Sequence, residues 1–200
     1  MEKDIIMDKS LLELSSMFET SRLILRKYEK GDGKEFFQLL ETGNNREDLI
    51  EHIAEATSIK SEEEAEVRIQ ELSSDWLEQT RFVMGIWLKS SNKYVGQIWI
   101  EPNKWEVPSF ELGWYLDQSF QGQGIATEAA KASIKFIFEN LQAHKIIVIT
   151  RDDNERSSKL AERLGFHKEG HLREHSVKKN GTRVGLLYYG ILKNEWKESL

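Results

Sequence analysis

Hydrophobic positions along the chain follow two spacings, and these spacings predict helices and strands. Apolar residues three or four positions apart predict helices at 4–18, 35–40, 47–56, 61–79, 123–141 and 155–164. Alternating or continuous apolar runs predict strands at 22–28, 82–88, 94–100, 110–116, 145–150, 167–177 and 183–192. Strands concentrated in the middle and at the end, with helices between them, predict a mixed α/β (α+β) sheet with helices packed around it.

Short local signals fix several element ends. Ser61 followed by Glu64 is a capping box, so a helix begins there. Gly165 is a typical stop after the helix at 155–164. Asn180-Gly181 predicts the turn of a hairpin between the last two strands. The nearly continuous apolar run at 145–150 is typical of a strand buried on both faces.

Composition narrows the class of protein. A chain of 200 residues suits one domain, and the absence of cysteine excludes disulfides, thiolate catalysis and cysteine-ligated metal, so no metal site is expected. No apolar run reaches about 18 residues, and Met1–Ser10 has scattered charges, so we expect a cytoplasmic protein without a membrane partner. A net charge of −6 argues against nonspecific nucleic-acid binding.

The segment after the strand at 110–116 is the most informative one. A turn with Gly122 and Gly124 leads directly into a helix, which directs unpaired amides and the positive end of a helix dipole at one point. The expected ligand is a phosphate or pyrophosphate. A P-loop would need Gly-Lys-Ser/Thr, and a dinucleotide fingerprint would need glycine at Thr127, so both fail. A tight turn without ligand remains the alternative.

Five sequence blocks resemble those of the GNAT N-acetyltransferases, in the same order. Gln121-Gly-Gln-Gly-Ile-Ala126 resembles the Q/R-x-x-G-x-G/A motif of that family. The other blocks are Thr20–Arg26, Glu111–Leu116, Asn154-Glu-Arg-Ser157 with Leu164-Gly-Phe166, and 170–196. The similarity covers about residues 20–197 and is strongest to the branch of ribosomal-protein N-acetyltransferases and spermidine acetyltransferases.

The resemblance implies a fold and a domain division. It implies a mostly antiparallel twisted sheet of about seven strands, with helices on both faces and a splayed central pair formed by 110–116 and 145–150. Residues 20–200 would form the GNAT-like domain, and residues 1–19 an N-terminal extension. That extension is a candidate helix, disordered arm or dimer contact, so a homodimer is among the expected assemblies.

The resemblance also implies acetyl-CoA as acetyl donor. Backbone amides of the glycine turn would hold its pyrophosphate, and Asn154 would bond the pantetheine arm. The cofactor-binding candidates are Leu116, Gln121, Gly122, Gln123, Gly124, Ala126, Thr127, Asn154 and Ser157. Lys131, Arg156 and Lys159 are candidates for the 3′-phosphate. For Asn154 the alternative is an ordinary helix cap.

Three residues are candidates for catalysis. Strand alternation places Glu111 on one face with Gly113 and Tyr115. The resemblance implies that a glutamate on this strand accepts the proton of the amine, usually through water. The alternative is a solvated glutamate without a catalytic role. The resemblance places Ser157, where many relatives have tyrosine, near the thioester sulfur as proton donor. Some relatives have an acid on the terminal hairpin; the matching Ser176 cannot act as a base, so its neighbour His175 is the third candidate.

These features predict an N-acetyltransferase in which an amine attacks the donor directly. A protein N-terminal amine of the ribosomal type is the favoured acceptor, because its pKa lies near 7.7–8.0 and it needs only a modest base. A polyamine or aminoglycoside and a non-catalytic acyl-CoA-binding module are the alternatives. Residues 46–78 contain eleven acidic and three basic side chains, so a cationic acceptor is expected.

Overall fold

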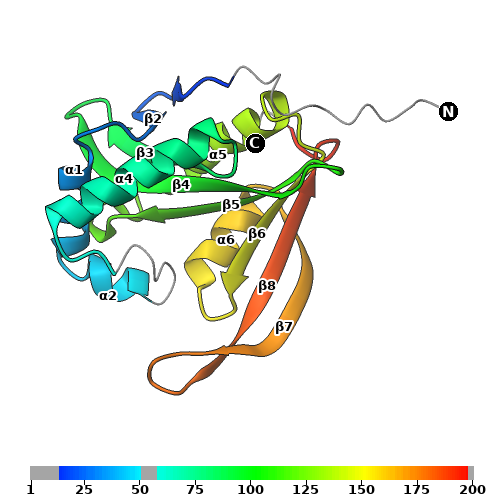
Figure 1. Ribbon diagram of the computed structural model, residues 1–200. Coiled ribbons are helices and arrows are strands. Elements are labelled where there is room, and N and C mark those ends of the chain that lie inside the picture. Colours follow the sequence, from blue (N-terminus) through cyan, green and yellow to red (C-terminus); the bar gives the residue numbers. More distant parts are fainter. Residues whose placement is uncertain (1–13, 51–57, 198–200) are drawn as a thin grey trace.

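A computed structural model describes residues 14–50 and 58–197, and a single sheet of eight strands runs through it (Figure 1). The strand order is β1-β2-β3-β4-β5-β6-β8-β7. The strands are β1 Met17–Glu19, β2 Leu23–Lys27, β3 Phe82–Leu88, β4 Lys93–Lys104, β5 Ser109–Leu116, β6 Lys145–Arg151, β7 His167–Val177 and β8 Arg183–Leu192. Every neighbouring pair is antiparallel except β5 and β6, so the sheet is mixed, as expected.

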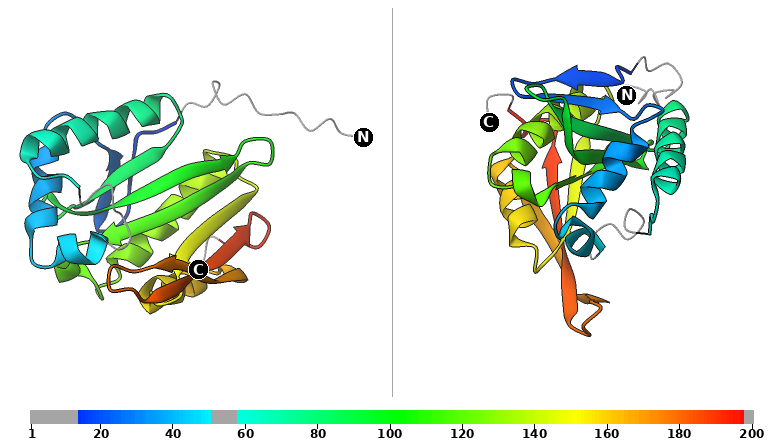
Figure 2. Two further views of the ribbon diagram at one scale, coloured as in Figure 1. Left: turned by 60° about the horizontal axis from the view of Figure 1, so that its bottom comes forward. Right: turned by 90° about the vertical axis from the view of Figure 1, so that its left-hand side faces the viewer.

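Helices cover both faces of this sheet (Figure 2). The helices are α1 Gly33–Glu41, α2 Asn45–Ile50, α4 Glu62–Leu77, α5 Ile125–Glu139 and α6 Glu155–Arg163, with a short 3-10 turn, η2, at Gln118–Phe120. In the right-hand view of Figure 2, α1 and α4 lie on one side of the strands and α5 and α6 on the other. No helix in the described ranges is both long and apolar enough to cross a membrane.

The predicted elements are confirmed over most of the chain. All seven predicted strands are present, and Ser61 caps α4 by accepting a hydrogen bond from the amide of Glu64, as the capping box indicated. The helix predicted at 47–56 corresponds to α2 over its first part, and its residues 51–56 lie outside the described residues.

The helix predicted at 4–18 is wrong where the structure describes it. Residues 1–13 lie outside the described residues, but Met17–Glu19 form the edge strand β1, paired with β2. Phe18 stacks on Phe136 of α5 with ring centroids 5.4 Å apart. This strand pairing and this aromatic contact outweigh local helical spacing, and they add an eighth strand to the expected seven.

Two hydrophobic clusters lie on opposite faces of the sheet. One includes Ile125, Ala129 and Ile137 of α5, and the other includes Phe36 of α1 and Ile69 of α4. Each fully buried isoleucine or phenylalanine side chain contributes about 1.5–3 kcal/mol to folding. The clusters fix the strands from both sides, so residues that project from one strand have well-defined positions.

Strand β6 is less buried than its apolar sequence predicted. Ile146 and Val148 are buried, but Ile147 and Ile149 on the opposite face are only half-buried. The buried face packs on the α5 side, because Ile146 and Val148 belong to the cluster that includes α5. The other face of β6 is therefore only partly covered, next to the point where β5 and β6 separate.

The central strands separate, as the resemblance implied. The parallel pairing of β5 with β6 covers only Ser109 with Lys145, Phe110 with Ile146 and Glu111 with Ile147. Beyond this point β5 continues to Leu116 and β6 to Arg151 without pairing with each other, so their facing edges are open. Their unpaired backbone groups can therefore bond an inserted ligand, and Glu111 marks the point of separation.

Candidate active site

The turn before α5 has the conformation that its glycines permit. Gly122 has φ 75° and Gly124 has φ 77°, both in the left-handed region, and α5 begins at the next residue, Ile125. Nothing lies within 4 Å of the position a side chain would take at Gly122, so the turn is open on that side. Glycine therefore serves both the tight bend and a close approach by a ligand.

The amides of this turn have no acceptor within the described part of the chain. Glu128 is the first residue of the helix to bond back, from its amide to the carbonyl of Gly124 at 3.0 Å. The six preceding amides, at 122–127, have no hydrogen-bond partner among residues 14–50 and 58–197. Together with the positive end of the helix dipole they form a site suited to an anion.

Side chains of the turn fold back and stiffen it. Gln121 Nε2 donates to the carbonyl of Leu116 at 3.1 Å, and Gln123 Nε2 donates to the carbonyl of Ser119 at 3.0 Å. The side-chain amides of Gln121 and Gln123 and the carbonyl of Leu116 thus hold the turn in place. What remains free for a ligand in this segment is its backbone amides.

A glutamate and an arginine fasten this turn to the start of β2. Arg22 Nε contacts Glu128 Oε2 at 2.6 Å, and Arg22 Nη1 donates to the carbonyl of Gln123 at 3.0 Å. Glu128 also accepts hydrogen bonds from Thr20 Oγ1, Ser21 Oγ and the amide of Arg22. Burial alone would raise the pKa of Glu128, but these hydrogen bonds overcome it and lower the pKa to about 2.

Sequence reasoning missed the partnership of Arg22 and Glu128. The available signals were an arginine at the head of the first predicted strand and an acid in the first turn of the glycine-preceded helix. Neither shows that the two residues meet, because more than a hundred positions separate them along the chain.

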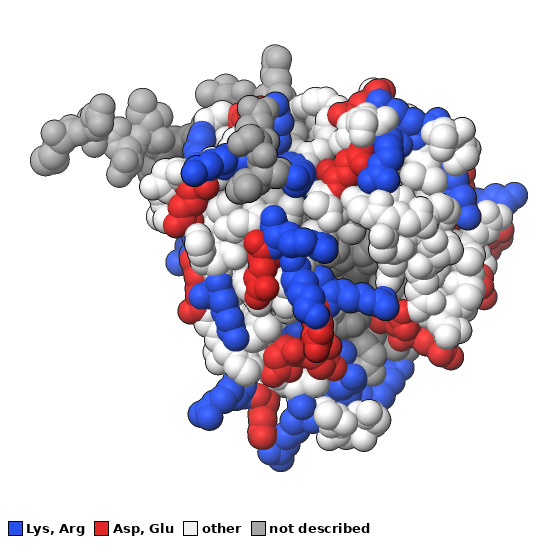
Figure 3. Space-filling view, turned by 180° about the vertical axis from the view of Figure 1, so that it is seen from behind, with Lys and Arg blue, Asp and Glu red and all other residues white. Residues whose placement is uncertain are grey.

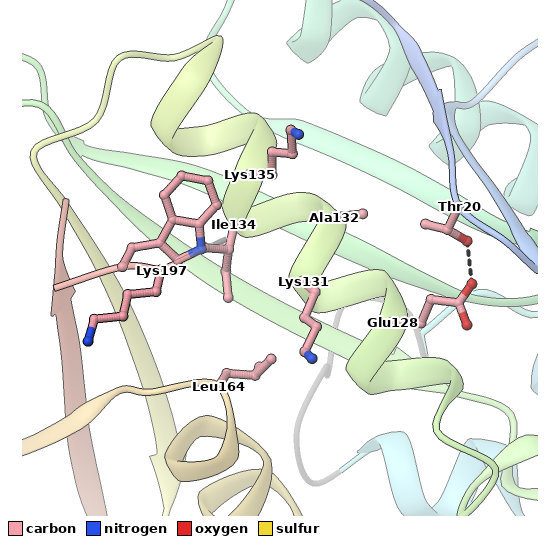
Figure 4. A pocket seen from close by; sticks show the side chains of 9 residues that line it. Thr20, Glu128, Lys131, Ala132, Ile134, Lys135, Leu164 and Lys197 are labelled. Atoms are coloured by element: carbon pink, nitrogen blue, oxygen red, sulfur yellow. Dashed lines mark hydrogen bonds between the residues drawn. The ribbon is translucent and has the colours of Figure 1, made fainter. Parts of the chain in front are cut away.

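The basic residues proposed for the 3′-phosphate differ in their surroundings. Arg156 donates to Gln121 Oε1 at 2.5 Å, and Lys159 pairs with Glu155 at 2.8 Å. Lys131 has no ion pair within the described residues, and it lies at a groove of about 290 Å³ along α5 (Figure 4). Figure 3 shows lysine and arginine side chains beside a hollow on the face that carries α5 and α6. Lys131 is therefore the free cation of the three.

Asn154 and Ser157 lie at the start of α6. Asn154 is the N-cap, and its Oδ1 accepts a hydrogen bond from the amide of Ser157 at 3.1 Å. The capping interpretation is therefore correct, but it uses only the oxygen of the side chain. Asn154 Nδ2 and Ser157 Oγ have no partner in the portion of the chain described, and both residues are only half-buried. These two polar atoms remain available to a ligand.

Glu111 lies at the point where β5 and β6 separate. It pairs with Ile147 in the last register position that the two strands share. Its carboxylate has no hydrogen bond or ion pair with any described residue, although the residue is only partly exposed. Burial, followed by the negative charge of Glu101, raises the pKa of Glu111. An unpaired carboxylate with a raised pKa suits a general base.

The structure does not bring His175 together with Glu111. Gly190 of β8 pairs with Ile147, which is at the level of Glu111, whereas Val184 pairs with Ser176, the neighbour of His175. Six residues of β8 separate the two levels, which corresponds to roughly 20 Å along a strand. His175 is exposed, and its Nδ1 lies 2.9 Å from Ser176 Oγ. Its position on the projecting hairpin argues against a catalytic role.

Comparison with known proteins shows the family of this chain. The model of the acetyltransferase (GNAT) domain matches residues 22–167, which include the glycine turn, Glu111 and Asn154. The chain belongs to the GNAT acetyltransferase family. It is therefore an N-acetyltransferase by family, and acetyl-CoA is the acetyl donor of such enzymes.

Curated relatives of this GNAT chain include several ribosomal-protein enzymes. YdaF of Bacillus subtilis, provisionally named a ribosomal N-acetyltransferase, is 36% identical over 44% of this chain and 47% of its own length. The ribosomal protein uS5-alanine N-acetyltransferase of Escherichia coli is 36% identical over 32% of this chain and 33% of that enzyme. The matches to both relatives thus cover half or less of their length. YnaD of Bacillus subtilis, an uncharacterized N-acetyltransferase, is 25% identical over 88% of this chain and 97% of its own.

Solved structures show the same GNAT fold. A ribosomal L7/L12 α-N-protein acetyltransferase in complex with coenzyme A superposes with a TM-score of 0.77 at 23% identity, covering 88% of this chain and 97% of that one. The ribosomal-protein-S5-alanine acetyltransferase from Vibrio fischeri superposes with a TM-score of 0.78 at 21% identity, covering 92% and 100%.

Proposed function

We propose that this protein acetylates the N-terminal amine of a ribosomal protein, with acetyl-CoA as donor and direct attack by the amine. The observation on which the proposal rests is Glu111, an unpaired, partly buried carboxylate where β5 and β6 separate. The names of the ribosomal-protein relatives support the acceptor class. Neighbouring residues of a strand project from opposite faces, and Leu112 packs on the face that carries α5. Glu111 therefore projects from the other face of β5, so the donor and the acceptor would approach the site from different faces of the sheet.

The residues at the mouth of the separated strands fit the donor. The free amides at 122–127 would hold its pyrophosphate, Asn154 Nδ2 would bond its pantetheine arm, and Lys131 would face its nucleotide end. Bound acetyl-CoA supplies an activated thioester carbonyl. The turn needs no rearrangement for this task, because Gln121, Gln123 and Arg22 already hold it.

Proton transfer would involve two of the candidate residues. Glu111 accepts a proton from the acceptor ammonium, directly or through one water, and this frees the nitrogen lone pair. The nitrogen forms the new bond to the acetyl carbon as the carbon–sulfur bond breaks, and the acylated nitrogen then releases its second proton to the solvent to give the neutral amide. The hydroxyl of Ser157 gives a proton to the departing sulfur and regains one from the solvent. No covalent intermediate with the protein forms, and His175 has no part in the proposed reaction.

The free energy needed to deprotonate the acceptor favours an N-terminal amine. Neutralising a lysine with a pKa of about 10.4 at pH 7 costs about 4.6 kcal/mol, whereas an α-amine costs about 1–1.4 kcal/mol. A single carboxylate with a raised pKa can deprotonate an α-amine more readily than a lysine, because the α-amine requires less free energy. An α-amine therefore matches a site with a single general base.

A polyamine or aminoglycoside is the second candidate acceptor. The acidic stretch 46–78 favours it, because three consecutive glutamates, Glu62, Glu63 and Glu64, begin α4. Such a surface attracts any cationic amine by long-range electrostatics. A homodimer, the cytoplasmic location and the absence of nucleic-acid and membrane partners stay predictions.

The test is coenzyme A release with a panel of acceptors. Peptides with the N-terminal sequences of ribosomal proteins, the same peptides with blocked N-termini, spermidine and an aminoglycoside are compared at equal concentration. We expect release only with free N-termini. Turnover of spermidine without peptide turnover would replace the ribosomal acceptor by a polyamine. Tight acetyl-CoA binding without turnover of any amine would identify a binding module.

A further inference from the structure

Two glutamates lie directly opposite each other on neighbouring strands. Glu101 of β4 and Glu111 of β5 are register partners in the antiparallel pair. Side chains at such positions project from the same face and have Cβ atoms about 4.5–5.5 Å apart, so like charges there destabilise the sheet. The charge of Glu101 contributes to the raised pKa of Glu111. This costly arrangement suggests that a cation belongs between the two carboxylates.

The two carboxylates have different partners. Arg81, just before β3, contacts Glu101 Oε1 with its Nε at 2.8 Å. Glu111 has no such cation in the described residues; its register partner on β6 is Ile147, and Lys145 of β6 is held by Glu169 at 2.6 Å. Glu101 therefore has a cationic partner within the chain, whereas the carboxylate of Glu111 has none among the described residues and is left for a cation from outside.

An indole ring lies next to this pair on the same face. Trp99 of β4 is the register partner of Gly113 of β5. A Cβ added at Gly113 would lie 2.0 Å from the Trp99 ring, so the ring covers the glycine backbone. Trp99 is only partly buried, and its Nε1 has no hydrogen bond with a described residue. Glycine at 113 is therefore required for this placement of the indole beside Glu111.

We propose that Glu101 and Trp99 form, with Glu111, the binding site for the ammonium form of the acceptor amine. This inference rests on the proposed function and adds two residues that determine acceptor specificity. The ammonium lies between the carboxylates, where it relieves their repulsion, and over the indole, whose face attracts cations. Glu111 then accepts one proton and the neutral amine attacks. The site selects primary amines that arrive as cations.

The first experiment measures amine binding without turnover. Protein loaded with coenzyme A is titrated calorimetrically with two probes, spermidine and a short peptide amide with a free N-terminus. We expect saturable binding of at least one probe, weakened tenfold or more by Glu101→Gln and by Trp99→Leu, and largely retained in Trp99→Phe. The exposed turn variant Glu106→Gln is the control and should bind like the unmodified protein. Unchanged affinity in Glu101→Gln, or binding of neither probe, would overturn the proposal.

A second measurement uses variants with opposite expected effects. The acid limb of the pH profile of kcat/KM reports the protonation of Glu111. Removing the neighbouring charge in Glu101→Gln lowers the pKa of Glu111 and moves this limb to lower pH. Removing the guanidinium in Arg81→Gln leaves Glu101 uncompensated and moves the limb to higher pH. General damage to the fold would not produce shifts of opposite sign, and shifts of the same sign would contradict the site.

Failure of this inference can be told apart from failure of the proposed function. If the protein turns over amines but Glu101→Gln keeps both its probe affinity and its pH profile, the ammonium site is wrong and the acetyltransferase proposal stands. If the probes bind in a Glu101-dependent way but no coenzyme A is released, the ammonium site stands and the proposed activity is wrong.

Discussion

The two sides of the candidate active site are built from different parts of the chain. On the donor side, the turn at 122–127 offers backbone amides, and its side chains serve to hold it in shape. On the side proposed for the acceptor, Glu111, Glu101 and Trp99 project from paired strands and offer side-chain groups. A backbone site depends on chain conformation, whereas a side-chain site depends on which residues the strand register brings together.

This difference decides what each kind of substitution can change. In the turn at 122–127, a side chain can be exchanged without removing a ligand group, but a change in backbone conformation removes several at once. On the acceptor side, a single carboxylate can be neutralised while the fold is kept.

Neutralising Glu111 should separate catalysis from donor binding. Glu111→Gln removes the group that accepts the proton, so we expect kcat to fall about 10²–10⁴-fold. The dissociation constant for acetyl-CoA should stay the same, because the donor is held by the turn at 122–127. Turnover assays and calorimetry measure the two quantities, with the exposed Glu106→Gln as the matched control. Full activity in Glu111→Gln would remove it from the mechanism.

A glycine with a left-handed φ in the turn at 122–127 should matter more for acetyl-CoA binding than such a glycine in another turn. Gly124 has φ 77° and Gly181, in the turn between β7 and β8, has φ 83°. Alanine at either position costs about 1–2 kcal/mol of stability, because the left-handed region is strained for residues with a Cβ. Only Gly124→Ala should also weaken acetyl-CoA binding. We expect its dissociation constant to rise roughly tenfold, which corresponds to about 1.4 kcal/mol.

Thermal unfolding and calorimetry of these two alanine variants test the comparison together. Equal losses of stability with unequal losses of affinity are the expected pattern. If Gly181→Ala weakened donor binding as much as Gly124→Ala does, the effect would be a general loss of structure and not a loss of the anion site.

Asn154 allows its two roles to be tested separately. Asn154→Ala removes the cap of α6 and should cost about 1 kcal/mol of stability. Asn154→Ser keeps a capping oxygen but lacks the Nδ2 donor, so it should keep most of the stability and bind acetyl-CoA a few-fold less tightly. Chemical unfolding and calorimetry measure the two effects. Unchanged donor affinity in Asn154→Ser would leave the residue with a capping role alone.

The smallest expected effect concerns Glu128, which with Arg22 fastens the turn at 122–127 to β2. It is a change in how the free energy of unfolding depends on acid pH. Hydrogen bonds lower the pKa of Glu128 to about 2, so its contribution to stability is complete above its ordinary pKa of 4.5. The contribution is lost as the pH falls from 4.5 towards 2. Urea unfolding at pH 5 and pH 3 should show a smaller loss for Glu128→Gln than for the unmodified protein. An equal loss in both would mean that Glu128 does not contribute to acid sensitivity.

Local signals made much of the donor side predictable from the sequence. Gly122 and Gly124 predicted a tight turn because glycine adopts left-handed backbone angles at the least cost, and the alternative interpretation of Asn154, a cap before a helix, is correct. The predicted ends of α4 and of the last hairpin also agree with the structure, because a capping box and Asn180-Gly181 act over a few residues.

Contacts between distant segments could not be predicted in this way. Met17–Glu19 form a strand only because β2 and Phe136 lie beside them, so their own spacing gave the wrong element. The ion pair between Arg22 and Glu128 depends on where α5 lies relative to β2. The position of Glu101 directly opposite Glu111 depends on the register of β4 and β5. His175 was a candidate by residue type, but its register position on the hairpin is far from Glu111.

The amide resonances of the turn before α5 test the central claim most directly. In a protein labelled with ¹⁵N, coenzyme A should shift the amide signals of residues 122–127 to lower field, because these groups gain a charged acceptor. Pantetheine, which lacks the pyrophosphate, should leave the same signals almost unchanged. Binding of coenzyme A without any shift in this segment would contradict the account, because the pyrophosphate would then lie elsewhere.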